Sequence, residues 1–287
     1  MRLLKNKVII NSIKCPVCGQ PFRTDERGSL LCLGKKTHCY DFSSSGYVNF
    51  SCPAQSGGGD SKGAVRARSL FLDSGAYLPV ANAVCEMLDE FSPNGGLVID
   101  AGCGEGYYSC LIANNGYSVC GADISKFAVD AAAKRATRGE LEKAFFCTAS
   151  VFELPLVNSC ADAVVNIFAP CVEKEYSRVL KDEGVLVVAW AGEEHLMGLK
   201  SVIYDNTHIN TARADLPQSM EKIFEKRVKY QIELTSNDQI LNLFSMTPYY
   251  WRTSSEDREK LSGLNSLTTQ IDIIISVYKN HTFEEIQ

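Results

Sequence analysis

Four cysteines and a histidine are the side chains best suited to chemistry in the first fifty positions. Cys15 and Cys18 are separated by two residues, Cys32 follows 14 positions later, and His38 and Cys39 are adjacent. Thiolates and an imidazole at this spacing are typical of a tetrahedral Zn²⁺ site, which takes four ligands. Because five candidates compete for four positions, the spacing leaves open whether His38 or Cys39 completes the site. Buried cysteines without a metal are the alternative interpretation.

A second group of candidate residues lies in a glycine-rich segment. The apolar stretch "LVID" runs into "AGCGEGYYS", which places Asp100, Gly102, Gly104 and Gly106 on a strand-to-helix turn. Glycines there allow a sharp turn and the close approach of a ligand. The G-x-G-x-G spacing disfavours a dinucleotide, which favours G-x-G-x-x-G, and the lysine of a P-loop is absent. Asp123 ends the next strand-like segment, where its carboxylate can accept hydrogen bonds from both hydroxyls of a ribose. An ordinary turn without a ligand is the alternative.

The elements that must position these residues alternate between strand and helix. Short apolar segments are predicted as strands, and segments with helical spacing lie between them, Ser125 being a plausible N-cap. The predicted strands are 95–100, 117–123, 143–150, 160–169 and 183–190, the helices are 104–116, 124–137 and 172–180, and two late strand candidates are 227–234 and 268–280. This alternation predicts an α/β fold with a doubly wound parallel sheet (Rossmann-like) and a small N-terminal zinc-binding module.

The segment between the cysteine cluster and the first strand contains a compositional break. Residues 53–63 hold four glycines and no apolar periodicity, and we expect a flexible linker there. Helical spacing follows within 64–91, broken near Gly75 and Pro79. We therefore expect a zinc-binding module over 1–52, a linker and connecting helix over 53–75, and a second, larger domain over 76–287.

Charge is distributed unevenly along the 287 residues. Residues 1–70 contain 11 Lys or Arg and 4 Asp or Glu, a balance of +7, whereas the remainder carries −12, which gives the total of −5. A basic N-terminal segment followed by an acidic remainder indicates that one part of the chain contacts a polyanion and another part is catalytic. Chance segregation of surface charges is the alternative. No apolar run is long enough for a membrane span, and no signal peptide is recognisable. Twelve cysteines, eight of them scattered singly, favour a reducing cytoplasmic location.

The glycine loop and Asp123 together resemble the cofactor site of class I S-adenosylmethionine-dependent methyltransferases. "SVFELPLVNSCADAVV" is similar to the third-strand exit and fourth strand of that class, and "VLKDEGVLVVAW" to the turn before its fifth strand. The resemblance extends further. "CPVCGQPF", "ARSLFLDSGAY", "DAGCGEGYYS", "NIFAPC", "HLMGLK" and "MTPYYWR" occur in one order between residues 15 and 252 and resemble the large-subunit ribosomal RNA guanine-N1 methyltransferases of the zinc-bearing RlmA type.

This resemblance implies a function and a set of site residues. The implied activity is S-adenosylmethionine-dependent methylation of N1 of a guanine in a hairpin of 23S rRNA, recognised with the help of the zinc module; it is also compatible with a homodimer. The implied zinc ligands are Cys15, Cys18, Cys32 and His38, which favours His38 over Cys39. The implied cofactor contacts are Tyr77, Gly104, Glu105 and His195, beside Asp100, Gly102, Gly106 and Asp123 of the loop and second strand. A core aromatic and a helix cap are the alternatives for Tyr77 and His195.

The substrate side is less constrained by the sequence. "NIFAPC" lies at the end of the fourth predicted strand, where substrate meets cofactor, so Asn166 could hold the guanine edge and Phe168 could stack on it. A strand-end amide satisfied by its surroundings is the alternative for Asn166. We expect the RNA phosphates to be contacted by Lys35, Lys36, Arg66 and Arg68. A small-molecule methyltransferase with a purely structural zinc knuckle, and a non-catalytic RNA-binding module, are the competing functions.

Overall fold

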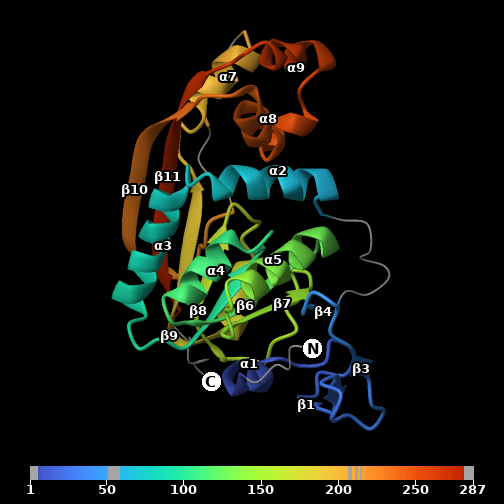
Figure 1. The fold of residues 1–287 in the computed structure, drawn as a ribbon. Helices are drawn as coiled ribbons and strands as arrows, with labels where there is room; N and C mark the ends of the chain where they lie inside the picture. Colours follow the sequence, from blue (N-terminus) through green and yellow to red (C-terminus); the bar gives the residue numbers. More distant parts are fainter. Residues whose placement is uncertain (1–5, 51–58, 206–208, 211–212, 214, 281–287) are drawn as a thin grey trace.

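The computed structural model describes residues 6–50, 59–205, 209–210, 213 and 215–280, and a sheet of eight strands forms its centre (Figure 1). The strand order is β10-β11-β9-β8-β5-β6-β7-β4. The bounds are β4 Val48–Asn49, β5 Leu97–Ala101, β6 Ser118–Asp123, β7 Ala144–Thr148, β8 Ala161–Ile167, β9 Leu180–Ala191, β10 Glu221–Leu234 and β11 Leu267–Lys279.

The central strands β7, β6, β5, β8 and β9 are parallel neighbours. In chain order their positions are 3-2-1-4-5, the doubly wound order, in which the crossovers diverge on either side of β5. Strand β11 then joins β9 antiparallel, and β10 pairs antiparallel with β11 at the edge. The predicted α/β sheet is therefore confirmed, and its carboxyl edge beside β5 and β8 is the place where a ligand is expected.

Helices cover both faces of the sheet, and each face has its own hydrophobic core. One core contains side chains of α2, α3, α4, α5, α7 and α8; the other contains those of α1 and α6. The helices are α1 Lys7–Ser12, α2 Lys62–Asp73, α3 Leu78–Phe91, α4 Tyr107–Asn114, α5 Lys126–Arg138, α6 Glu173–Val179, α7 Met197–Ile203, α8 Asn237–Ser245 and α9 Ser255–Ser262, with a 3₁₀ helix η2 at Pro248–Trp251. Ser125 caps α5 by accepting a hydrogen bond from the backbone N–H of Ala128, as predicted.

The N-terminal segment packs onto the second face of the sheet. Its strands β1 (Phe22–Thr24), β2 (Leu30–Cys32) and β3 (Cys39–Tyr40) form a small antiparallel sheet beside α1, at the lower end of the view in Figure 1. Ile9, Ile13 and Leu30 are fully buried in the same core as Leu97 of β5. The next strand, β4, pairs in parallel with β7. The segment thus shares its apolar core with the large sheet, which compensates for its own small size.

The predicted helical spacing and its break near Gly75 are present, since α2 ends at Asp73 and α3 begins at Leu78, but two details differ. Residues 53–58 of the expected linker are outside the described residues. Helix α2 begins at Lys62, within the range predicted for the linker. It begins there because Ser61 caps the helix by accepting a hydrogen bond from the backbone N–H of Ala64. Pro79 does not break a helix, since it occupies the first turn of α3, where a proline needs no backbone hydrogen bond. Within the described residues, no helix is long and apolar enough to cross a membrane.

Candidate active site and metal centre

A cavity of about 990 Å³ opens at the carboxyl edge of the parallel strands. Its floor comes from the turns after β5, β6, β7 and β8, and α2, the start of α3 and the segments before α7 and around η2 form its walls. The residues expected at the cofactor are gathered here: Tyr77, Asp100, Gly102, Gly104, Glu105, Asp123 and His195 all line the cavity. Gly106 lies beside it as the N-cap of α4.

The glycine loop and Asp123 hold each other in place. One carboxylate oxygen of Asp123 accepts from the backbone N–H of Gly104 at 3.0 Å, and the other accepts from the N–H of Ser125 at 2.8 Å. These bonds orient the carboxylate at the end of β6, and each oxygen keeps a further lone pair. Burial raises the pKa of Asp123. The arrangement suits a ligand that donates two hydrogen bonds, as a ribose does.

Gly102 is required by the close approach of two turns. Its φ is +85°, and a Cβ at this position would lie 2.5 Å from the Cβ of Ala169 in the turn after β8. No side chain fits between the two turns. The glycine therefore allows the cofactor loop and the "NIFAPC" segment to meet at one edge of the cavity.

Two acidic side chains beneath the loop are buried and electrostatically perturbed. Burial raises the pKa of Asp100 to about 7, although the hydroxyl of Ser109 donates to its carboxylate. Burial also raises the pKa of Glu105, which is 2% exposed, and Oε1 of Glu105 has no hydrogen-bond partner among the described residues. This oxygen lies 3.9 Å from Nη2 of Arg135, an ion-pair but not a hydrogen-bond distance, so it can still accept a hydrogen bond from a bound molecule.

Tyr77 and His195 form a buried pair, although they are far apart in the chain. The hydroxyl of Tyr77 lies 3.2 Å from Nε2 of His195, and Nδ1 of His195 accepts from the backbone N–H of Asp272 at 3.3 Å. Burial lowers the pKa of His195 to about 4, so the ring is neutral at pH 7. His195 does not cap the following helix, whose N-cap is Leu196. Both members of the pair face the cavity.

The "NIFAPC" segment places its two candidate residues differently. Phe168 lines the cavity with 45% of its surface exposed, and its ring stacks with the imidazole of His195 at a centroid distance of 6.2 Å. Asn166 is fully buried and does not line the cavity. Its amide nitrogen donates to the carbonyl of Pro170 and to the hydroxyl of Tyr176, both at 3.0 Å. These contacts match the alternative in which Asn166 is a satisfied strand-end amide.

Several lining residues had no role assigned from the sequence. Arg213 and Asp215 form an ion pair with a 2.5 Å contact, and Arg213 also donates to the carbonyl of Ala169. Tyr249, from the "MTPYYWR" motif, donates to Asn210 at 3.2 Å. That motif was the sequence signal for the cavity wall around η2. Residues so distant in sequence from the glycine loop come close to the loop only through the fold.

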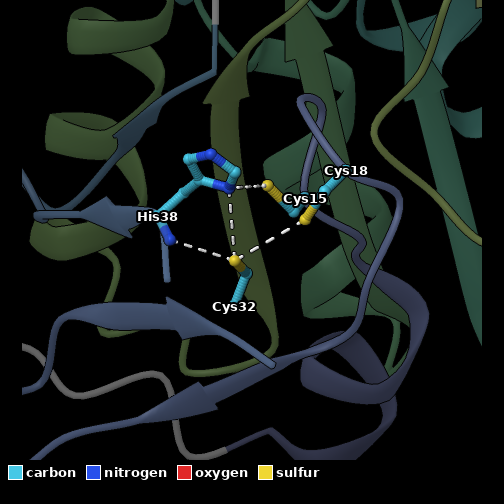
Figure 2. A group of neighbouring side chains, drawn as sticks. All are labelled: Cys15, Cys18, Cys32 and His38. Carbon is cyan, nitrogen blue, oxygen red and sulfur yellow. Dashed lines mark hydrogen bonds between the residues drawn. The ribbon is translucent and has the colours of Figure 1, made fainter. Parts of the chain in front are cut away.

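The cysteine cluster is assembled in the N-terminal segment, where Cys15 and Cys32 belong to the second core. The sulfur and nitrogen atoms of Cys15, Cys18, Cys32 and His38 all lie within 4.8 Å of one another (Figure 2). Nδ1 of His38 is 3.5 Å from the sulfur of Cys15 and 3.4 Å from that of Cys32. Tetrahedral Zn²⁺, with bonds of about 2.3 Å to sulfur and about 2.0 Å to nitrogen, would separate sulfur from nitrogen by about 3.5 Å. The four residues therefore fit zinc in both kind and spacing.

The local backbone explains which neighbour joins the cluster. His38 and Cys39 are consecutive in extended backbone leading into β3, so their side chains point to opposite sides. Cys39 is exposed and its thiol lies 3.8 Å from a carboxylate oxygen of Asp41, outside the cluster. The backbone N–H of His38 donates to the sulfur of Cys32 at 3.0 Å and lowers the pKa of that thiol to about 6. A thiolate ready to bind metal follows from this contact.

The four residues expected to contact RNA occupy three settings. Lys35 and Lys36 are exposed in the loop between Cys32 and His38, both of which belong to the cluster. Arg66 is exposed on α2, which lies near the middle of Figure 1, apart from β1 and β3. Arg68 lies within the cavity and pairs with Asp60. The structure thus keeps the lysines together and separates them from the two arginines.

The sheet order, the antiparallel β11 and the glycine loop beneath a cavity are those of class I methyltransferases, in which S-adenosylmethionine supplies the methyl group. Asp123 and the unsatisfied Glu105 fit the ribose and a donor of this cofactor. The chain belongs to the methyltransferase domain family, whose model matches residues 93–245. It is therefore a methyltransferase.

Two curated relatives are similar over nearly the whole chain. A Streptomyces fradiae protein named 23S rRNA (guanine(748)-N(1))-methyltransferase is 26% identical over 283 residues, which cover 94% of this chain and 98% of that protein. A Bacillus subtilis (strain 168) protein, YxjB, provisionally named a 23S rRNA (guanine-N(1)-)-methyltransferase, is 26% identical over 291 residues, covering 96% of this chain and 100% of its own. Both similarities extend well beyond the methyltransferase domain.

Proposed function

We propose that the protein transfers a methyl group from S-adenosylmethionine to N1 of a guanine in a hairpin of 23S rRNA. The observation that carries this proposal is the extent of the similarity to relatives with that named activity. A match over 94% of this chain and 98% of the Streptomyces fradiae protein extends beyond the methyltransferase domain into the N-terminal segment. A methyltransferase of small molecules would share the catalytic fold alone.

The size of the cavity supports a substrate that enters beside the cofactor. Its volume of about 990 Å³ lies at the upper end of the ~300–1,000 Å³ typical of small-molecule sites. The glycine loop and Asp123 border one half, and Phe168 with the segment around η2 borders the other. An unpaired or flipped guanine is the form that can enter, because N1 is hidden in a paired stem.

The residues of the second half can orient the base. In this proposal the exposed ring of Phe168 stacks on the guanine and His195 supports that ring from behind. Asn166 acts as a positioning residue, since its contact with the carbonyl of Pro170 fixes the turn that carries Phe168. When bound, S-adenosylmethionine supplies an electrophilic methyl group, and the surrounding side chains hold the nucleophile in line and exclude water.

The N-terminal segment would recognise the RNA. Zn²⁺ held by Cys15, Cys18, Cys32 and His38 would fix both ends of the loop that carries Lys35 and Lys36. Two exposed ammonium groups on a fixed loop suit contacts with phosphate, which position an RNA without reading its sequence. We propose residues 1–52 as this recognition module, 53–75 as its connection and 76–287 as the catalytic part. A homodimer and a cytoplasmic location belong to the same proposal.

Primer extension on 23S rRNA tests this function directly in cells. Methylation at N1 blocks the Watson–Crick edge and stops reverse transcription one nucleotide before the modified base. Ribosomal RNA from cells with the gene should give a stop at one guanine, and cells that carry Asp123→Ala should lose it. A pattern of stops that is unchanged by deletion of the gene would contradict the proposal.

A further inference from the structure

The guanidinium of Arg68 lies inside the cofactor half of the cavity. Arg68 comes from α2, its side chain is 24% exposed, and it forms an ion pair with Asp60 at 2.5 Å. Nη1 of Arg68 is the nearest atom to a Cβ built on Gly104, at 3.5 Å. The cation therefore stands directly over the open face of the cofactor loop.

The charged side chains that line the cavity are mostly acidic, so Arg68 can have a role that they cannot. The acidic lining residues are Asp60, Asp100, Glu105, Asp123 and Asp215. Such a wall suits a ligand with positive groups, and S-adenosylmethionine carries a sulfonium and an ammonium. The same ligand also carries one carboxylate, which needs a cation within this acidic surface.

Arg68 is better placed than Arg213 to provide that cation. The guanidinium of Arg213 is held by Asp215 and by the backbone carbonyl of Ala169, in the turn after β8. Arg68 is held by the carboxylate of Asp60. A carboxylate of the protein thus occupies the position that a carboxylate of the ligand would take.

Glu105 is a second, independent observation that points to the amino-acid end of the cofactor at this turn. Its Oε1 is buried, lacks a hydrogen-bond partner within the described part of the chain and lies 3.9 Å from Nη2 of Arg135. Glu105 follows Gly104 directly, so an unsatisfied acceptor and a guanidinium border the same turn. The amino-acid end of the cofactor, with one ammonium and one carboxylate, matches this pair of opposite charges.

We propose that Arg68 binds the carboxylate of the methionine portion of S-adenosylmethionine and that Asp60 occupies Arg68 in the free protein. Binding replaces the Arg68–Asp60 ion pair with an ion pair to the ligand. The assignment rests on the cofactor half of the proposed function and is independent of the RNA. It replaces the expectation from the sequence that Arg68 contacts phosphate.

Calorimetry with two ligands tests this assignment. S-adenosylhomocysteine contains the amino-acid end, whereas 5′-methylthioadenosine keeps the adenosine and sulfur but lacks that end. Arg68→Gln should raise the Kd of S-adenosylhomocysteine about 10- to 100-fold, the effect expected for a charge-assisted hydrogen bond, and leave the Kd of 5′-methylthioadenosine unchanged. Arg66→Gln, an exposed neighbour on the same helix, is the matched control and should alter neither.

Other results would overturn the assignment. An equal loss of both ligands would mean that Arg68 supports the adenosine site or the fold, and weaker RNA binding with normal S-adenosylhomocysteine binding would return it to a phosphate contact. Asp60→Asn should tighten S-adenosylhomocysteine alone, because the competing carboxylate is removed; weaker binding would show that Asp60 is no competitor. If the ligand affinities changed as predicted but RNA methylation were absent, the proposed rRNA substrate would be contradicted. The assignment of Arg68 to the cofactor carboxylate would still stand.

Discussion

Nε2 of His195 lies 3.2 Å from the hydroxyl of Tyr77, and the backbone N–H of Asp272 donates to Nδ1 on the other side of the ring. A nitrogen that accepts a hydrogen bond carries no proton, so the neutral ring holds its proton on Nε2 and donates it to Tyr77. The hydroxyl of Tyr77 is then left to donate to a further acceptor. The cavity that both residues line is where that acceptor would be bound.

Tyr77→Phe removes this donor but keeps the ring, which packs edge-on against Phe71 at 5.8 Å. We expect the Kd for S-adenosylmethionine, measured by calorimetry, to rise about tenfold, the value of one hydrogen bond to a charged group. The melting temperature should also fall, because Nε2–H of His195 loses its partner. A lower melting temperature with unchanged affinity would make the pair purely structural.

The buried His195 predicts a specific dependence of stability on pH. Its pKa is about 4 in the folded protein and 6.5 ordinarily, so below pH 6.5 the unfolded chain takes up a proton that the folded chain does not. The folded state therefore loses about 1.4 kcal/mol per pH unit between 6.5 and 4. Asp100 acts oppositely, since its pKa of about 7 favours the folded state as pH falls from 7.

Comparison with His195→Gln separates the two effects, because both proteins contain Asp100. Urea unfolding at pH 7.5 and pH 5 should show wild type losing stability relative to the variant as pH falls. Parallel losses in the two proteins would contradict the assignment to His195.

The metal centre predicts different results for neighbouring residues. Cys32→Ser and His38→Ala should abolish stoichiometric zinc, measured by elemental analysis, whereas Cys39→Ser should retain it because that thiol points away from the cluster. Removal of zinc should lower the melting temperature of the whole chain in one transition, since the cluster shares its core with the sheet. A separate early transition for the N-terminal segment would contradict this shared core.

Lys35 and Lys36 predict an effect on RNA that leaves the cofactor untouched. Their replacement by alanine should weaken binding of a 23S rRNA hairpin and lower the slope of log K against log salt by about 0.7–0.9 for each phosphate that the variant no longer neutralises. The exposed Lys143 and Lys174 provide a double variant of equal charge, which should bind RNA as wild type does. If both double variants lost RNA affinity equally, the effect would come from net charge and not from the position of Lys35 and Lys36.

Gly102→Ala predicts a destabilisation from steric overlap as well as from backbone strain. Its Cβ would meet that of Ala169 at 2.5 Å, whereas Gly46 has a similar positive φ of +95° with nothing within 4 Å. Gly46→Ala should cost about 1 kcal/mol of unfolding free energy. Gly102→Ala should cost clearly more and also weaken S-adenosylmethionine binding. Similar costs at both positions would mean that the two turns can separate freely.

The parallel sheet and its cofactor loop could be predicted because each depends on local sequence. Strand and helix periods alternate from residue 96 onward, and the glycines and Asp123 mark the ends of adjacent strands. The cysteine spacing indicated the metal site for a similar reason. The spacing alone left His38 and Cys39 open. The family resemblance favoured His38, and the backbone direction before β3 gives the physical reason.

The remaining features depend on contacts between distant residues. Tyr77 and His195 meet across 118 positions, and a buried Asn166 is distinguished from an exposed one only by the packing of Tyr176. The sequence predicts a phosphate contact for Arg68 as for its neighbour Arg66, because both belong to the basic N-terminal part of the chain. Its place in the cavity follows from how α2 packs against α5 and α8, which no local pattern contains.

The central claim is methyl transfer to N1 of guanine in 23S rRNA. Purified protein, S-adenosylmethionine with a labelled methyl group and an unmodified 23S rRNA hairpin transcript can be combined, and the RNA digested to nucleosides for mass spectrometry. We predict labelled 1-methylguanosine from one position, which disappears when that guanine is replaced by adenine. Label in another nucleoside, or none in RNA while small molecules are methylated, would contradict the account.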